Sequence, residues 1–130
     1  MTTHILTNLD DILTRLRQVY REIHQHPELS LEEHATAERI ETELSRLDVE
    51  VQRIGGTGVV AVIRNGTGPT VLARADTDAL PVAEQTGLEY SSQIDGAMHA
   101  CGHDMHVATL LGAVEVLATN KDSWSGTYIG

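Results

Sequence analysis

Five consecutive apolar residues, Val-Val-Ala-Val-Ile at positions 59–63, limit the fold of this chain more than any other segment. A short apolar run without polar alternation, rich in β-branched residues, is typical of a strand with both faces covered. Gly-Gly at 55–56 and Asn-Gly at 65–66 mark turns on either side of it. We therefore expect residues 58–64 to form a strand that is covered on both faces.

Three further segments predict strands because they are short, rich in β-branched residues and bounded by turn signals. They are residues 49–54, 70–75 and 126–130. The remaining apolar residues recur with a helical period, so both element types contribute to one core. The pattern predicts an α/β fold in which helices pack on a mixed sheet.

Three helices are expected. Residues 9–23 carry apolar side chains at the i, i+3, i+4 and i+7 spacing of a helix that ends before Pro27. Ser30 and Glu33 form a capping box for a second helix, which carries Leu31 inward and fades near Asp48. The third helix covers about residues 104–118.

Charge and composition exclude several classes of protein. The chain has 9 Lys and Arg against 19 Asp and Glu, a net charge of −10, and contains no Phe, one Trp and three Tyr. Binding to phosphates requires a basic face, and binding to single strands requires aromatic platforms. We expect no nucleic acid and no membrane partner. A single cysteine allows no internal disulfide, so we expect a cytoplasmic protein.

The predicted strand at 126–130 ends at the last residue of the sequence. Chain termini normally lie outside the core and fray, so a strand that enters a sheet at a terminus is unusual. We expect residues 1–130 to be the N-terminal part of a longer, truncated chain. The alternative is a short edge strand that closes a small domain.

The densest group of metal-ligating side chains lies at residues 98–106, Met-His-Ala-Cys-Gly-His-Asp-Met-His. Thiolate and imidazole together suit zinc and similar divalent metals. Cys101 and His103 would face one ion if the segment is extended, and Gly102 allows a sharp turn. A lone Cys-x-His pair also occurs by chance, and free cysteines are often inert core residues. His99 and His106 would bind metal, substrate or other side chains of the site.

Two other polar clusters are candidates. Asp76 and Asp78 follow a predicted strand, where α/β sheets place ligands, and either carboxylate would suit the free N–H of a metal-bound histidine. Aspartate at a strand end is also common in ordinary turns. His24, His26 and Glu28 surround Pro27 at a helix end, where capping and turn formation are the simpler roles.

Taken in order, the motifs at 24–30, 74–81 and 98–106 closely resemble metal-dependent amidohydrolases of the aminoacylase and carboxypeptidase clan. The nearest subgroup contains hippurate hydrolase, N-acyl-amino-acid amidohydrolase and indoleacetyl-amino-acid hydrolase. The resemblance implies that residues 1–130 are the N-terminal part of a metallohydrolase catalytic domain. The rest of that domain and a lid and dimerisation domain would be absent, and the full-length form would be a homo-oligomer.

The resemblance also implies roles for individual residues. Cys101 and His103 match metal ligands of the subgroup, and Asp76 matches the aspartate of the strand-end motif, a catalytic position. Sister families have a histidine ligand where this chain has Arg74, so that role does not transfer. The cofactor implied is a divalent metal ion: zinc, manganese, cobalt or nickel.

The function implied for the full-length parent is metal-dependent hydrolysis of the amide bond of small N-acyl amino acids or related peptides. The paired-glutamate motif of the clan, which supplies a general base and a ligand, is missing from this chain, so we expect the 130 residues alone to be inactive. The competing reading is a small non-catalytic α/β domain whose polar clusters are structural.

Overall fold

The computed structural model describes residues 5–130, and its strands form one four-stranded sheet. The strands are β1 (Glu50–Ile54), β2 (Gly58–Asn65), β3 (Thr70–Leu72) and β4 (Gly126–Ile129), in the spatial order β1-β2-β4-β3. β2 pairs antiparallel with both β1 and β4, whereas β3 and β4 are parallel. The predicted mixed sheet is confirmed.

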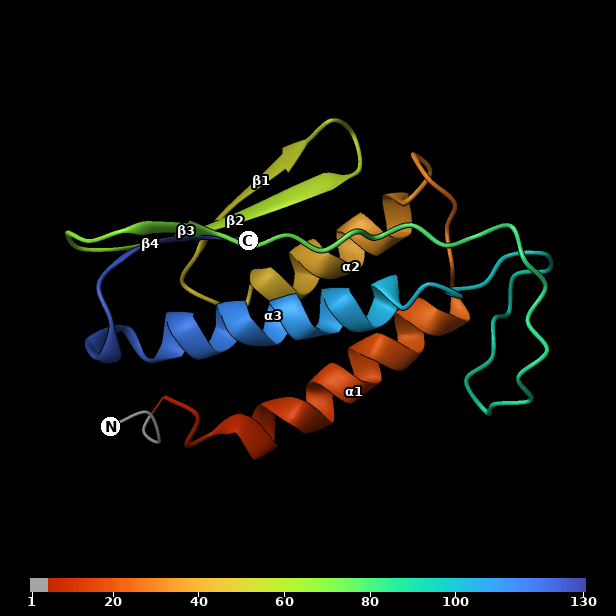
Figure 1. The fold of residues 1–130 in the computed structure, drawn as a ribbon, viewed down its shortest axis with the longest axis horizontal. Helices are drawn as coiled ribbons and strands as arrows, with labels where there is room; N and C mark the ends of the chain where they lie inside the picture. The colour runs from red at the N-terminus through yellow and green to blue at the C-terminus, as the bar shows by residue number, and fades with distance from the viewer. Residues whose placement is uncertain (1–4) are drawn as a thin grey trace.

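The helices α1 (Leu9–Gln25), α2 (His34–Leu44) and α3 (His103–Thr119) lie on one side of the sheet (Figure 1). α2 and α3 contact β2 and each other, and α1 packs against α3. A short 3₁₀ helix, Lys121–Ser123, leads from α3 into β4. The layers are therefore the sheet, then α2 with α3, then α1. No helix among residues 5–130 is both long and apolar enough to cross a membrane.

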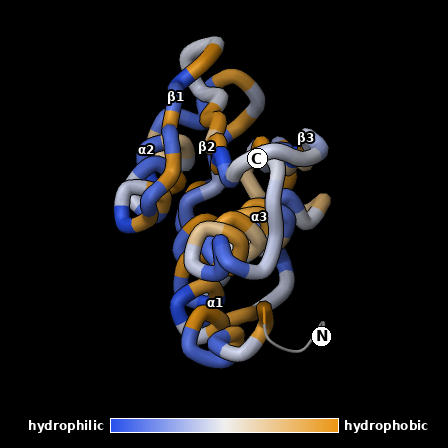
Figure 2. Tube along the Cα trace, turned by 90° about the vertical axis from the view of Figure 1, so that its left-hand side faces the viewer, coloured by the Kyte–Doolittle hydropathy of each residue, from blue (hydrophilic) through white to orange (hydrophobic). Residues whose placement is uncertain are grey.

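Apolar side chains from all three layers form one core. Figure 2 colours the chain trace by hydropathy, and hydrophobic stretches (orange) occur in the helices and in the strands. α1 contributes a stripe at helical spacing, β2 contributes alternate residues, and α3 lies between them. The buried members are Ile12, Leu16, Val19, Ile23, Ile40, Leu44, Ala61, Ile63, Val107, Leu111, Val114 and Val116.

The expectation that the strand at 58–64 is covered on both faces is wrong. Ala61 and Ile63 are 2% and 1% exposed, but Val60 and Val62, which alternate with them along the strand, are only half-buried. Strand side chains alternate between the two faces, and all three helices lie on the face of Ala61 and Ile63. Leu72 of β3 is 67% exposed, so the sheet's other face is open in the part of the chain described.

The predicted start of the second helix is also corrected. Residues 29–32 make a turn, in which Leu31 has a φ of 70° and is 78% exposed instead of buried. α2 begins at His34, and the capping box does not form. The carboxylate of Glu28 takes its place by accepting the backbone N–H groups of Ala35 and Thr36 at 3.1 and 2.6 Å.

Candidate functional site

Three segments that are far apart in the sequence meet at one end of the molecule. They are residues 24–30 at the end of α1, the extended residues 74–81 and residues 98–106 at the start of α3 (Figure 1). These are the three motifs that carry the predicted chemistry, so the fold brings all of them together.

Backbone hydrogen bonds join these segments. The Ala79 N–H donates to the Glu28 carbonyl at 2.7 Å, and Leu80 exchanges two bonds with Met98 at 2.9 and 3.0 Å. The middle segment thus pairs with both of the others. These backbone hydrogen bonds, and not side chains alone, fix the position of residues 74–81 with Asp76 and Asp78.

His103 is the first residue of α3, and its ring is held by Asp78. Nδ1 lies 2.9 Å from the Asp78 carbonyl oxygen and 2.9 Å from its Oδ1. A proton on Nδ1 donates to these oxygens, which leaves Nε2 as the nitrogen with a lone pair. An imidazole anchored in this way has the tautomer and orientation of a metal ligand.

Cys101 is a free, exposed thiol one glycine before His103. The segment is not extended, contrary to one expectation. Gly102 has a left-handed φ of 80° and is the N-cap of α3, so it makes the sharp turn that its lack of a side chain permits. Thiol and imidazole therefore lie on either side of a turn at a helix start.

Asp76 lies in a different environment from Asp78. Its carboxylate forms an ion pair with Arg74 at 3.0 Å, and its side chain is 47% exposed. Of the two aspartates that were candidates to orient a ligand histidine, the structure places Asp78 against His103. Asp76 makes no contact of this kind and lines a cavity beside the segment, as Asp78 also does.

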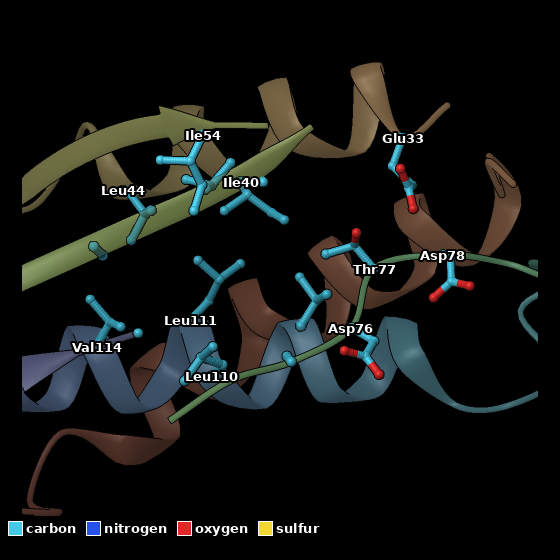
Figure 3. A pocket seen from close by; sticks show the side chains of 16 residues that line it. Glu33, Ile40, Leu44, Ile54, Asp76, Thr77, Asp78, Leu110, Leu111 and Val114 are labelled. Atoms are coloured by element: carbon cyan, nitrogen blue, oxygen red, sulfur yellow. The ribbon is translucent and has the colours of Figure 1, made fainter. Parts of the chain in front are cut away.

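That cavity has a volume of about 300 Å³ and lies between the sheet and the helices (Figure 3). Its polar end is formed by Glu33, Asp76, Thr77 and Asp78. Glu33 is 6% exposed and points toward these residues, and its Oε2 has no hydrogen-bond partner. The rest of the lining is mainly apolar and comes from α2, α3 and β2.

The two remaining histidines of the motif at 98–106 differ in burial. His106 is exposed, with its ring centre 5.9 Å from that of His103. His99 is 4% exposed, and neither ring nitrogen has a hydrogen-bond partner. Burial lowers the pKa of His99; the charge of Asp104 opposes this shift, and His24 adds to it.

Within residues 5–130, no three His, Cys, Asp or Glu side chains come together as a group that would hold a metal ion. The thiol of Cys101 and the anchored ring of His103 fit a divalent metal as donors, because each has an available lone pair. They amount to part of a ligand set. A complete catalytic site takes about three protein ligands.

Sequence reasoning missed one group, which is centred on His24. Its Nδ1 lies 2.6 Å from Oδ2 of Asp104, and its Nε2 lies 2.9 Å from Oε1 of Glu84. All three side chains are at most 5% exposed. The sequence singled out His24 only as a member of the polar cluster around Pro27, and Glu84 lies in a polar loop with no periodicity, so no local signal linked the two.

Glu84 is held as an anion. Burial raises its pKa, but hydrogen bonds from the Thr86 hydroxyl and the Ser92 N–H, together with the charge of His24, outweigh that effect. The net result lowers the pKa of Glu84 from 4.5 to about 2.

Comparison with known proteins identifies relatives. The family model for Peptidase family M20/M25/M40 matches residues 72–129. The chain is 51% identical over 112 residues to thermostable carboxypeptidase 1 of Saccharolobus solfataricus, covering 84% of this chain and 28% of that protein. It is 42% identical over 117 residues to an N-acetylcysteine deacetylase of Bacillus subtilis, covering 88% of this chain and 31% of that protein.

A solved structure shows the same fold. A dinuclear metal-binding peptidase of the M20 family from Bacillus subtilis matches with a TM-score of 0.88 and 40% identity, over 92% of this chain and 35% of that chain. The chain is therefore related to peptidase family M20/M25/M40, and the resemblance inferred from its motifs is confirmed. The chain spans less than a third of the length of the curated relatives described here.

The low pKa of Glu84 predicts a loss of stability in acid. Its value in the folded chain lies below 4.5, so its stabilising effect is complete above about pH 4.5 and is lost as the pH falls toward 2. In urea unfolding, Glu84→Gln should therefore lower the midpoint clearly near neutral pH and much less near pH 2.

The matched control is Glu89→Gln in the same loop, at an exposed carboxylate. It should change the midpoint little at either pH. An equal effect of Glu84→Gln at both pH values would contradict the assignment of Glu84 as a buried, stabilising anion.

Proposed function

We propose that the intact protein is a metal-dependent hydrolase that cleaves the amide bond of N-acyl amino acids or related peptides. Residues 1–130 would be the N-terminal part of its catalytic domain. The observation that carries the proposal is the anchoring of His103 by Asp78, one glycine away from the exposed thiol of Cys101. Relatives named carboxypeptidase and N-acetylcysteine deacetylase support this class of reaction.

In this proposal Cys101 Sγ and His103 Nε2 hold the metal, with further ligands from the rest of the protein. A relative described as a dinuclear metal-binding peptidase supports a divalent ion. Zinc, manganese, cobalt and nickel all suit thiolate and imidazole donors to differing degrees. When bound, such an ion polarises a carbonyl group and lowers the pKa of water toward neutrality.

The chain's own residues have distinct tasks. Asp78 keeps the proton of His103 on Nδ1, so that Nε2 is available as a donor atom. Gly102 supplies the left-handed turn that brings the thiol and the ring to one helix start. Asp76 is proposed as the catalytic carboxylate of the cavity, because it is half-exposed and carries only an exposed ion pair.

Location and assembly are further parts of the proposal. A single cysteine is typical of proteins kept in a reducing compartment, which supports the cytoplasm. The resemblance of the motifs to dimeric enzymes of the clan supports a homo-oligomer of the intact protein. The excess of acidic residues supports small-molecule substrates over nucleic acid.

The 130 residues alone should not hydrolyse acyl-amino acids, because Cys101 and His103 are too few ligands for a catalytic metal. The purified chain should release no amino acid from N-acetyl or hippuryl substrates in the presence of added zinc, manganese, cobalt or nickel. A rate that is abolished by a chelator would contradict this, because it would show a complete site within these residues.

Removing the thiol should remove the metal. In the intact protein, Cys101→Ala is expected to lose bound metal and metal-dependent turnover, as measured by elemental analysis and hydrolysis of N-acyl amino acids. His106→Ala is the control: the ring is exposed and near the site, so metal content should stay the same. Equal metal content and activity in wild type and Cys101→Ala would instead remove Cys101 from the site and overturn its assignment as a metal ligand.

Substitution of Asp78 should lower metal affinity, whereas substitution of Asp76 should lower turnover. Asp78→Asn removes the acceptor that fixes the His103 tautomer, and loss of such a partner typically costs about 10–100-fold in metal affinity. Asp76→Asn should leave metal affinity nearly unchanged and lower the turnover number. Competition with a chromophoric chelator gives the affinity, and the opposite order of effects would assign the orienting role to Asp76.

A further inference from the structure

His24 has no access to a substrate, yet it joins two of the three site motifs. It is 4% exposed and lies between carboxylates that are 80 and 60 positions away in the sequence. A buried imidazole with both nitrogens in use cannot act on a bound molecule. Its role has to be sought in what it holds in place.

Both contacts of His24 are satisfied when both ring nitrogens carry a proton. Nδ1 then donates to Asp104 and Nε2 donates to Glu84, so one imidazolium lies between two carboxylates. Such bonds between ionised groups are about twice as strong as those between neutral groups. The rings of Tyr20 and Tyr90, centred 5.8 and 5.4 Å away, cover the group.

Asp104 passes this restraint to the site, because it directly follows His103. Its Oδ1 accepts the Met105 N–H at 2.9 Å, while its Oδ2 binds His24. Through these two bonds the Asp104 carboxylate binds a backbone N–H of the first turn of α3 and joins that turn to His24 on α1. The residue before this turn is Gly102, whose backbone is the most permissive in the segment.

Glu84 is restrained in turn by its loop. It accepts the Ser92 N–H at 3.0 Å and a hydrogen bond from the Thr86 hydroxyl. A further backbone bond, from Gln93 to the Gln25 carbonyl at 2.8 Å, closes the loop onto the end of α1. This side of the imidazole therefore holds the loop, and the Asp104 side holds the start of α3.

We infer that His24 is a positioning residue for the Cys101–His103 pair, acting through Asp104 on the first turn of α3. This inference rests on the proposed metal-binding function of that pair. Without the imidazolium, Asp104 and Glu84 would be two buried carboxylates with no cation between them. Leaving a buried charge unpaired is costly, so the first turn of α3 would shift or fray toward water.

Two substitutions of His24 separate its hydrogen bond to Asp104 from its hydrogen bond to Glu84. The side-chain nitrogen of His24→Asn takes the place of Nδ1 and keeps a donor for Asp104. That of His24→Gln takes the place of Nε2 and keeps a donor for Glu84. Both remove the ring and its charge, so a purely structural loss would affect the two variants alike.

The test is cobalt binding to the intact protein, followed by the charge-transfer absorption of the Cys101 thiolate. His24→Gln should weaken Co²⁺ binding by about tenfold or more, the lower end of what loss of a supporting partner costs. His24→Asn should stay within about threefold of wild type, because it keeps the bond to Asp104. Hydrogen exchange at the Met105 amide should rise in the Gln variant only.

The control for global stability is Glu43→Gln, in a separate buried ion group with Arg15 and Arg39. It should lower the unfolding midpoint and leave cobalt affinity unchanged. Equal cobalt affinities for the Asn and Gln variants, or weaker binding in Glu43→Gln, would overturn the positioning role alone. A wild-type protein without a Cys101-dependent band would overturn both this inference and the proposed function.

Discussion

The polar end of this chain depends on one imidazole between two carboxylates. His24 contacts Asp104 on α3 and Glu84 in the loop, and all three side chains are buried. Charged groups are rarely removed from water unless each is paired and hydrogen-bonded, and here each of them is. The group therefore has few alternative arrangements. The end of α1, the start of α3 and the loop must meet at this point, which sets the frame in which Cys101 and His103 lie.

The rest of the molecule is stabilised by apolar contact. α3 lies between α1 and the sheet, so its buried side chains face two layers, and Val114 at 2% exposure is typical of them. Packing of this kind fixes the position of α3 but has little directional preference. The hydrogen bonds of Asp104 are directional, so they fix the orientation of the start of α3. Apolar packing and buried charge therefore have separate roles in placing one helix.

Element types and the segments that form the candidate site were predictable, because both are encoded locally. Helical spacing located α1 and α3 to within a few residues, and three short motifs marked the segments that meet. The His24–Glu84 contact was not predictable, since the two residues are 60 positions apart and Glu84 lies in an aperiodic loop. The burial of β2 was mispredicted for a related reason, because an apolar run does not indicate whether other elements will pack on one face of a strand or on both.

The two aspartates of residues 74–81 show why residue type and spacing do not settle a role. By residue type and spacing alone they are equivalent, because both follow the same predicted strand and lie two positions apart. In the structure Asp78 presents two oxygens, one backbone and one carboxylate, to the same nitrogen of His103. Asp76 has only an exposed ion pair with Arg74, a kind of contact worth about 0–1 kcal/mol. A bound group can displace that pair at little cost, whereas displacing Asp78 would release the histidine. The carboxylate available to a ligand is therefore Asp76, and the one that holds the site in shape is Asp78.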